Sequence, residues 1–329
     1  MIHVPYIHTS KHTFRKAAVG CLSVVSLLGS LSAGATTLAD RISAATSTVA
    51  NNSACTDISY FYWEIGDQTQ TLASGTGGKQ VWGVPSPPAS SDVMKIASAS
   101  KWVFGAYVSE VQGGSFSAAD LEYLRMRAGY PGLTYHRLKK FTQCQSGQTV
   151  YECHTYNQND YHNSNDEGKF NYGGGHYQAM ASIELGLGSK TTTTLATEVN
   201  SVLGTGFSYD NPGLAGGAES SADNYAAFLR SILSGNLVIS SLLGSNAVAT
   251  DTTDTIYSPV SDPWHYSLGH WVETDGTFSS PGAQGFYPWI DSSETYYGII
   301  ARERAGGSED SVACGQVVRE AWFAGSPVL

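Results

Sequence analysis

The chain has 329 residues, with 18 lysines and arginines against 28 aspartates and glutamates, so its formal net charge at pH 7 is −10. A chain this acidic is a poor partner for the phosphate backbone of DNA or RNA, which argues against a nucleic-acid binding protein. Hydrophobic residues make up 41% of the sequence, which is ample for the core of one large domain or of two closely packed ones.

The first 35 residues are typical of a secretory signal. They hold three basic residues and no acidic one, then an apolar run over residues 17–31 and the small-residue site Ala33-Gly34-Ala35. A membrane anchor is the alternative, but a spanning helix needs about 20 mostly apolar residues, and this run is short and interrupted by glycine and serine. We expect the signal to be cleaved, which leaves no stable membrane anchor and gives a secreted or periplasmic protein. The mature chain then has 15 basic and 28 acidic residues and a formal charge of −13.

Two strands and a buried helix are predicted next, after a polar stretch that ends near residue 54. Residues 58–65 are dense in aromatic and β-branched side chains, a turn follows, and residues 69–73 can return as a second strand. Residues 75–91 are rich in Gly, Pro and Ser, which predicts a loop. Residues 94–111 predict a mostly apolar, buried helix that begins near Ser98.

The middle of the chain, residues 117–243, has helical periodicity on both sides of a long polar loop. From about residue 256 the pattern returns to strands and then to one helix. The strands are predicted at 266–273, 286–291 and 295–301, and the helix around 314–323.

These elements predict an α/β (α+β) fold in which a mixed, mainly antiparallel sheet is built from both chain ends and flanked by helices. The expected domain covers residues 36–329. Its sheet part is expected at about 55–97 and 256–329, and a largely helical inserted part at about 98–255.

Four cysteines follow the signal, an even number that favours disulfides in an exported chain. Four cysteines allow three pairings; we favour Cys144 with Cys153 across a short loop, and Cys55 with Cys314 joining the two chain ends. None has the Cys-x-x-Cys spacing of a zinc or redox site.

A candidate nucleophile lies in Ser98-Ala99-Ser100-Lys101. Ser-x-x-Lys at the start of a helix brings a hydroxyl and an amine onto one face, one turn apart. The pair reacts only if burial and neighbouring positive charge lower the pKa of the lysine enough for it to accept the serine proton. The motif also arises by chance in a serine-rich chain, so a surface pair is the alternative and the surrounding sequence decides between them.

The surrounding segments resemble the serine β-lactamase and penicillin-binding-protein superfamily, on its class C side, which also holds D-peptide hydrolases and carboxylesterases. Residues 95–101 resemble its nucleophile segment, and residues 133–147 its "iTirhLLtHtSG" helix and turn. Residues 215–223 resemble its "aGGl-sTa-D" segment, and residues 266–271 its "YGLGWW" strand. The segments follow one another in the family's order over most of the chain.

The resemblance implies roles for a second motif, which in this family is Tyr-x-Asn. Tyr172 matches its tyrosine, while Gly174 stands where the asparagine would be. Tyr172 would share general-base duty with Lys101, and we expect that lysine to lower the tyrosine's ordinary pKa of about 10. An ordinary core or surface tyrosine is the alternative interpretation.

The third motif is normally Lys-Thr-Gly or His-x-Gly on a strand that faces the nucleophile. Here Ser280-Pro281-Gly282-Ala283 takes its place and the cation is missing. The resemblance implies that Gly174, Ser280 and Gly282 bind substrate. It also implies that the backbone amides of Ser98 and Ala283 form an oxyanion hole.

The predicted function is therefore an exported serine hydrolase, without a cofactor, that forms an acyl-enzyme on Ser98 and cleaves a small-molecule, peptide or ester substrate. Carboxylesterase or D-peptidase activity is favoured, because Gly174 and Ser280 lack the groups that usually hold a substrate carboxylate. A catalytically weak protein that binds cell-wall peptides on the same fold is the main alternative, and a β-lactamase is the further one.

The polar loop before Tyr172 gathers histidines and carboxylates without the spacing of a metal site. The residues weighed are His154, Asp160, His162, Asp166, Glu167 and His176. We expect no metal, and a structural role for His176. Gly173-Gly174-Gly175 lacks the Gly-Lys-Ser/Thr that ends a phosphate-binding loop.

Overall fold

The computed structural model describes residues 36–133 and 144–329, and Thr36–Leu329 gather into one compact unit. The predicted signal at residues 1–35 and most of the segment at 133–147 lie outside the described residues. None of the described helices is long and apolar enough to cross a membrane.

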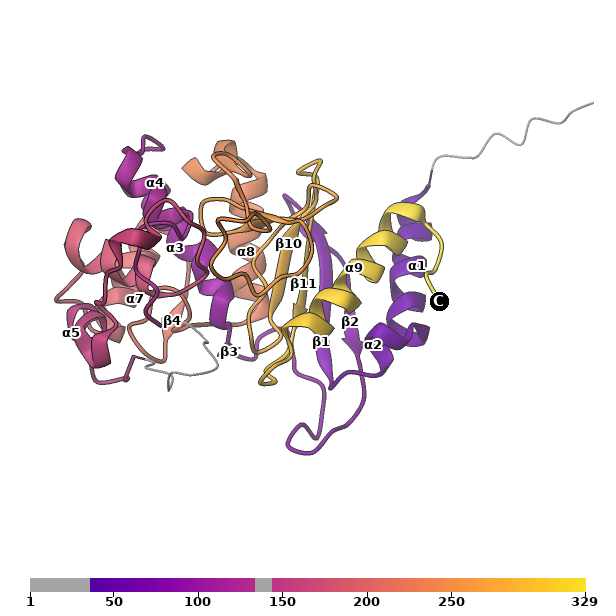
Figure 1. The fold of residues 1–329 in the computed structure, drawn as a ribbon. Helices are drawn as coiled ribbons and strands as arrows, with labels where there is room; N and C mark the ends of the chain where they lie inside the picture. The colour runs from indigo at the N-terminus through magenta and orange to yellow at the C-terminus, as the bar shows by residue number, and fades with distance from the viewer. Residues whose placement is uncertain (1–35, 134–143) are drawn as a thin grey trace, which may run out of the picture. The chain divides into compact units, whose positions relative to one another are not determined.

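An antiparallel sheet of eight strands runs through the unit in the order β2-β1-β11-β10-β9-β8-β7-β6 (Figure 1). Two of its strands come from the N-terminal part, β1 (Phe61–Asp67) and β2 (Thr71–Gly77). The others are β6 (Val248–Ala249), β7 (His265–Tyr266), β8 (Trp271–Val272), β9 (Phe278–Ser279), β10 (Tyr287–Ile290) and β11 (Tyr296–Ala301). Strand β1 pairs with β11, with Trp63 opposite Ile300, so both chain ends build the sheet and the predicted fold class is confirmed.

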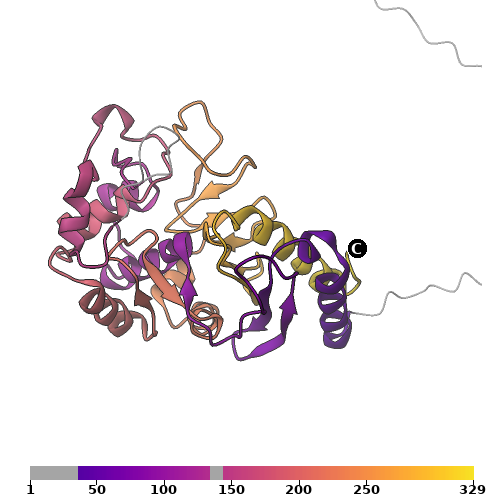
Figure 2. The same ribbon diagram turned by 90° about the horizontal axis from the view of Figure 1, so that it is seen from below.

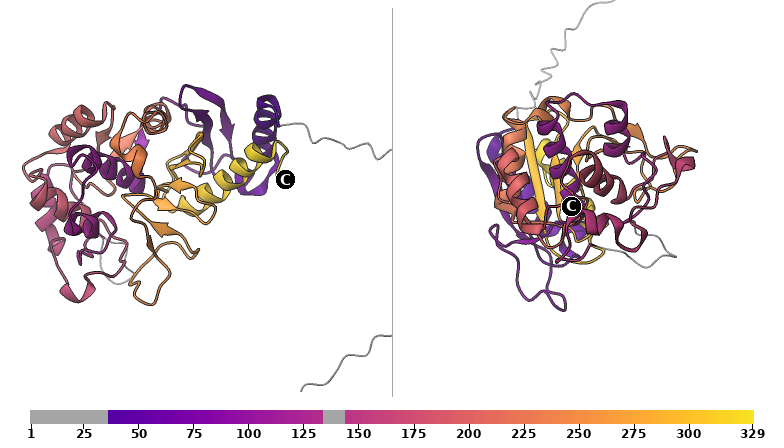
Figure 3. Two further views of the ribbon diagram at one scale, coloured as in Figure 1. Left: turned by 90° about the horizontal axis from the view of Figure 1, so that it is seen from above. Right: turned by 90° about the vertical axis from the view of Figure 1, so that its left-hand side faces the viewer.

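Alternation along β11 divides the core into two layers, as expected for a sheet covered on both faces. Tyr297, Ile299 and Ala301 belong to a core cluster shared with α3 and α8, whereas Ile300 belongs to a cluster shared with α1 and α9. Helices α1 (Leu38–Asn51) and α9 (Ser308–Ala324) therefore cover one face, together with the short α2 (Ser53–Thr56). Figure 2 and the left view of Figure 3 show α1 in indigo beside α9 in yellow.

Helices gather on the other face of the sheet (Figure 1). They are α3 (Ser100–Val111), α4 (Ala118–Leu124), α5 (Val150–Thr155), α6 (Gly175–Ala179), α7 (Thr192–Leu203) and α8 (Ala222–Leu233). Residues 100–109 of α3 are all buried, which agrees with the apolar character of its sequence. Gly105 lets α3 approach the turn after β7, because a Cβ there would lie 2.1 Å from the carbonyl oxygen of Leu268.

A second, three-stranded sheet stands beside the nucleophile segment. Its order is β3 (Met94–Lys95), β5 (Ala218–Ser220), β4 (Ser208–Tyr209). Because Met94 pairs with Ser220, the segment at 215–220 is held against the residues that lead into Ser98.

Two local predictions differ from the structure. The polar stretch before residue 54 forms α1, which begins with a capping box between Thr37 and Asp40 and buries Ala44, Ala45 and Val49. The strand predicted at 266–273 is a hairpin of β7 and β8, because Gly269 turns the chain with a φ of 85°.

Candidate active site

Ser98 lies in a 3-10 turn, Ala97–Ala99, that leads directly into α3. The residue before it, Ala97, has a φ of 45°, in the left-handed region that non-glycine residues rarely enter. Such strain costs of order 1–3 kcal/mol and gathers at functional sites. The turn leaves Ser98 half-buried at the wall of a cavity.

Lys101, one helical turn further on, is the polar partner of this serine. Its Nζ donates a hydrogen bond to the Ser98 Oγ at 2.9 Å and another to the backbone oxygen of Ala215 at 2.8 Å. The side chain is 5% exposed, and burial lowers its pKa to about 7. An amine that gives up its proton near neutral pH can accept the proton of a serine 2.9 Å away.

Tyr172 completes this group, but its pKa moves opposite to our prediction. Its ring lies 4.7 Å from the Nζ of Lys101 and stacks on Trp271 with ring centroids 5.3 Å apart. Burial raises the pKa of Tyr172 to about 12, and the hydrogen bonds with Ser98 and Trp271 lower it only in part. The pKa of Lys101 is about 7, so its amine is not permanently charged at pH 7. It therefore does not supply the fixed positive charge that a tyrosinate base would need. The expected lowering of the tyrosine pKa is wrong, and Tyr172 is a neutral hydroxyl at pH 7.

One cavity of about 940 Å³ contains the three side chains. Ser98, Lys101, Tyr172 and Ala283 all line it. Within residues 36–133 and 144–329, neither the Ser98 amide nor the Ala283 amide donates a hydrogen bond. Two unpaired amides beside a nucleophile are the donors that an oxyanion hole uses.

Ser280 and Gly282 lie behind this cavity, and neither is among its lining residues. The Ser280 side chain is 2% exposed, and its Oγ donates a hydrogen bond to the backbone oxygen of Ser98 at 3.0 Å. A Cβ at Gly282 would lie 2.2 Å from the backbone oxygen of Ile96. The two residues therefore hold the loop after β9 against the nucleophile turn, outside the cavity lining where the sequence predicted substrate-binding roles for them.

Gly174 lines the cavity at the position of the family's asparagine. A Cβ there would lie 2.9 Å from the Cβ of Leu133 and 3.2 Å from that of Ala215. Neighbouring side chains occupy the space of the missing amide, and the Ala215 carbonyl binds the lysine amine instead. A backbone oxygen leaves no signature in the sequence, so this partner could not be predicted.

Lys95 and Asp210 form an ion pair on the cavity wall that sequence reasoning did not assign. The Nζ and Oδ2 atoms are 2.9 Å apart, and each side chain is 42% exposed. Lys95 belongs to the nucleophile segment, and its place three residues before Ser98 is the sequence signal that could have identified it as a site residue. The carboxylate of Asp210 neutralises this cation, so Lys95 does not replace the missing cation of the third motif.

The histidines of the polar loop were the candidate metal ligands of the sequence. Across the described residues, no group of three potential ligands gathers. His176 is buried, its Nδ1 accepts a hydrogen bond from the Ala128 amide, and its Nε2 contacts the Asn171 oxygen at 3.0 Å. Burial lowers the pKa of His176 to about 4, so it is a neutral structural group.

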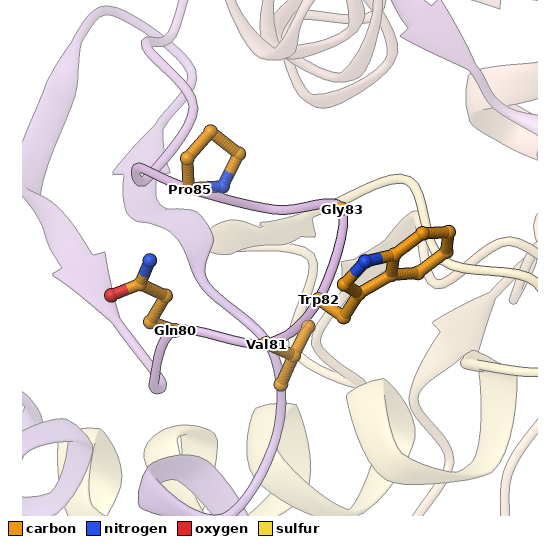
Figure 4. A pocket seen from close by; sticks show the side chains of 5 residues that line it. All are labelled: Gln80, Val81, Trp82, Gly83 and Pro85. Carbon is orange, nitrogen blue, oxygen red and sulfur yellow. The ribbon is translucent and has the colours of Figure 1, made fainter.

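The disulfides join Cys55 to Cys314, and Cys144 to Cys153, which lies on α5. Cys55 and Cys314 belong to the core cluster between α1 and α9, while Cys144 lines the cavity that also contains Ser98. A second, shallow pocket of about 560 Å³ lies in the loop at 80–85 (Figure 4). Its lining has no ionisable side chain, and Trp82 there is 94% exposed, so the pocket offers no catalytic group.

No protein-family model and no curated protein sequence matches this chain. Solved structures do match it. The hydrolase EstCE1, which has promiscuous acyltransferase activity, superposes with a TM-score of 0.62 at 14% identity, over 87% of this chain and 98% of that one. D-amino acid amidase from Ochrobactrum anthropi gives 0.60 at 12% identity over 86% and 98%, and a putative β-lactamase from Bacteroides dorei gives 0.54 at 18% over 79% and 93%.

These matches define the class of the fold. The chain has the β-lactamase and penicillin-binding-protein-like fold, which includes amidases and esterases as well as β-lactamases. At these identities the matches show the fold alone.

Proposed function

We propose that the protein is an exported serine hydrolase that cleaves an ester or amide through an acyl-enzyme on Ser98. The observation that carries this proposal is the buried Lys101, whose pKa is about 7 and whose Nζ lies 2.9 Å from the Ser98 Oγ. A structural lysine has no need for a low pKa and a serine partner inside a cavity.

The chemistry follows from these contacts. Ser98 Oγ attacks the substrate carbonyl carbon while its proton passes to the neutral amine of Lys101. The amides of Ser98 and Ala283 stabilise the resulting oxyanion. The bond to the alcohol or amine then breaks, and this leaving group takes the proton from Lys101, with the Tyr172 hydroxyl as a relay. Water attacks the acyl group in the same way and restores Ser98.

Export is supported by the cysteines and by the first 35 residues. Both disulfides require an oxidising environment to persist, which the cytosol of most organisms does not provide. We expect the mature chain outside the cytoplasm, secreted or periplasmic.

Covalent labelling tests the proposal. The mature protein is incubated with a fluorophosphonate and, separately, with a penicillin, and its intact mass and adduct site are determined. We expect a phosphonyl adduct on Ser98, no adduct in Ser98→Ala, and slow or absent acylation by penicillin. A folded protein that gains no mass with either reagent is not a serine hydrolase, and rapid turnover of penicillin would indicate a β-lactamase.

A further inference from the structure

The α9 side of the catalytic cavity presents hydrogen-bond acceptors. Gln316, on α9, lines the cavity, and its Nε2 donates a hydrogen bond to the Oε2 of Glu273 at 3.1 Å. Glu273 is buried and forms an ion pair with Arg319 at 2.8 Å. A buried carboxylate paired with arginine is an acceptor only, so the amide nitrogen of Gln316 must face it.

The other end of the Gln316 amide is thereby fixed as well. Its Oε1 has no hydrogen-bond partner in the part of the chain that the structure describes, and it is not a buried atom. The side chain therefore has a free carbonyl oxygen at the cavity wall, while one of its two N–H groups is engaged by Glu273. An acceptor held in this way binds a donor such as an ammonium or an amide N–H.

The charges on the cavity wall also favour a cationic hydrogen-bond donor. Its carboxylates are Asp210, Asp262 and Glu309, and its amines are Lys95 and Lys101. Lys95 is paired with Asp210, and Lys101 has a pKa of about 7, so Asp262 and Glu309 leave the wall negative. A carboxylated substrate would meet like charge at this wall, and a cationic substrate would meet opposite charge.

We infer that Gln316, Asp262 and Glu309 make the cavity selective for esters or amides that carry a positively charged amino group away from the scissile bond. The inference rests on the proposed function of the same cavity. Glu309 also lies in the first turn of α9, where a carboxylate stabilises the helix terminus. That helix role alone would produce no preference among substrates, so the two roles can be separated by experiment.

The experiment compares three 4-nitrophenyl esters of equal chain length whose far ends carry an ammonium, a hydroxyl or a carboxylate, with Ser98→Ala as the background. Hydrolysis of the hydroxyl ester reports the proposed function. The ratio of kcat/KM between the ammonium and carboxylate esters reports the inference, and we expect it to exceed 10-fold at low salt on general electrostatic grounds. A ratio near one in an enzyme that hydrolyses the hydroxyl ester would overturn the selectivity alone.

Variants locate the source of the ratio. In Asp262→Asn with Glu309→Gln the ratio should fall toward one, and Gln316→Leu should also lower it because it removes the acceptor. Glu320→Gln is the matched control, since Glu320 is exposed on the same helix and is not among the residues that line the cavity. An unchanged ratio in the double variant, or an equal loss in Glu320→Gln, would refute the assignment.

A binding measurement covers the case in which no ester is hydrolysed. Trp264 and Trp271 line the cavity, so their fluorescence reports occupancy. Hexylammonium should quench it at lower concentration than hexanoate does, and the difference should disappear in the double variant. Equal binding of the two ions would overturn the inference even for an inactive protein.

Discussion

The hydroxyl of Ser280 donates a hydrogen bond to the backbone oxygen of Ser98, with 3.0 Å between the two oxygens. Ser280 lies in the segment that resembles the third motif, and its hydroxyl holds the nucleophile turn from behind. Ala97, which precedes Ser98 in this turn, has a left-handed φ of 45°. The turn therefore needs such support to keep its shape.

Replacing Ser280 with alanine should relax this turn. The lost hydrogen bond should cost about 1 kcal/mol of unfolding free energy. Displacement of the nucleophile should lower kcat by about 10-fold or more. Ser279→Ala is the control, because the buried Oγ of Ser279 has no hydrogen-bond partner among the described residues. Denaturant unfolding and ester kinetics measure both effects, and equal behaviour of the two variants would remove the proposed role of Ser280.

The pH dependence of acylation should follow Lys101. Its pKa of about 7 predicts that the rate rises as pH increases through 7 and then stays level, because the reactive amine is the neutral one. Lys101→Arg keeps the positive charge and cannot lose its proton, so labelling of Ser98 should fall by about 100-fold or more at every pH. Labelling of Ser98→Ala sets the background. A rate that is independent of pH between 5 and 9 would exclude Lys101 as the base.

Lys101 should also make stability depend on pH. Its folded pKa lies below the unfolded value of about 10.4, so the unfolded chain binds more protons between these two values. The unfolding free energy of the wild type should therefore rise from pH 7 to pH 10 relative to Lys101→Met, and the two should run parallel below pH 6. A relative fall over that window would contradict the sign of the shift.

Tyr172→Phe separates a relay from a tyrosinate base. With a pKa of about 12, the hydroxyl stays protonated over the working range, so its removal should lower kcat without introducing or removing a limb of the pH profile below pH 10. We expect a loss of about 100-fold, measured with the neutral ester. A wild-type limb between pH 8 and 10 that disappears in Tyr172→Phe would show that the tyrosine ionises there.

The fold was largely predictable because its signals are local. The aromatic and β-branched run of β1 and the apolar helix α3 follow from side-chain character alone. Helix α1 was missed because alanine, serine and threonine dominate it, although the Thr-x-x-Asp of its capping box was visible at Thr37.

For the site, the sequence predicted which side chains come together but not the contacts that hold them in place. Ser98, Lys101 and Tyr172 lie together at the cavity, as their order in the sequence suggested. What the sequence did not show are contacts made by backbone and by distant residues: the Ala215 carbonyl on the lysine, the Ser280 hydroxyl behind the serine, and the carboxylate that orients Gln316. These depend on how segments more than 40 residues apart pack together, which no local pattern encodes.

Gly174 provides the sharpest test of how this cavity differs from its relatives. Restoring asparagine at this position should destabilise the protein, because a Cβ would lie 2.9 Å from that of Leu133 and 3.2 Å from that of Ala215. Overpacking of this kind costs about 1–3 kcal/mol, so Gly174→Asn should lower the melting temperature without creating β-lactamase activity.

A second change should relieve the strain. Adding Leu133→Gly to Gly174→Asn removes the Cβ that would lie 2.9 Å from the new side chain, so the double variant should recover stability relative to Gly174→Asn alone. The coupling energy from the four unfolding curves measures this contact, and additive effects would show that Leu133 does not fill the asparagine position.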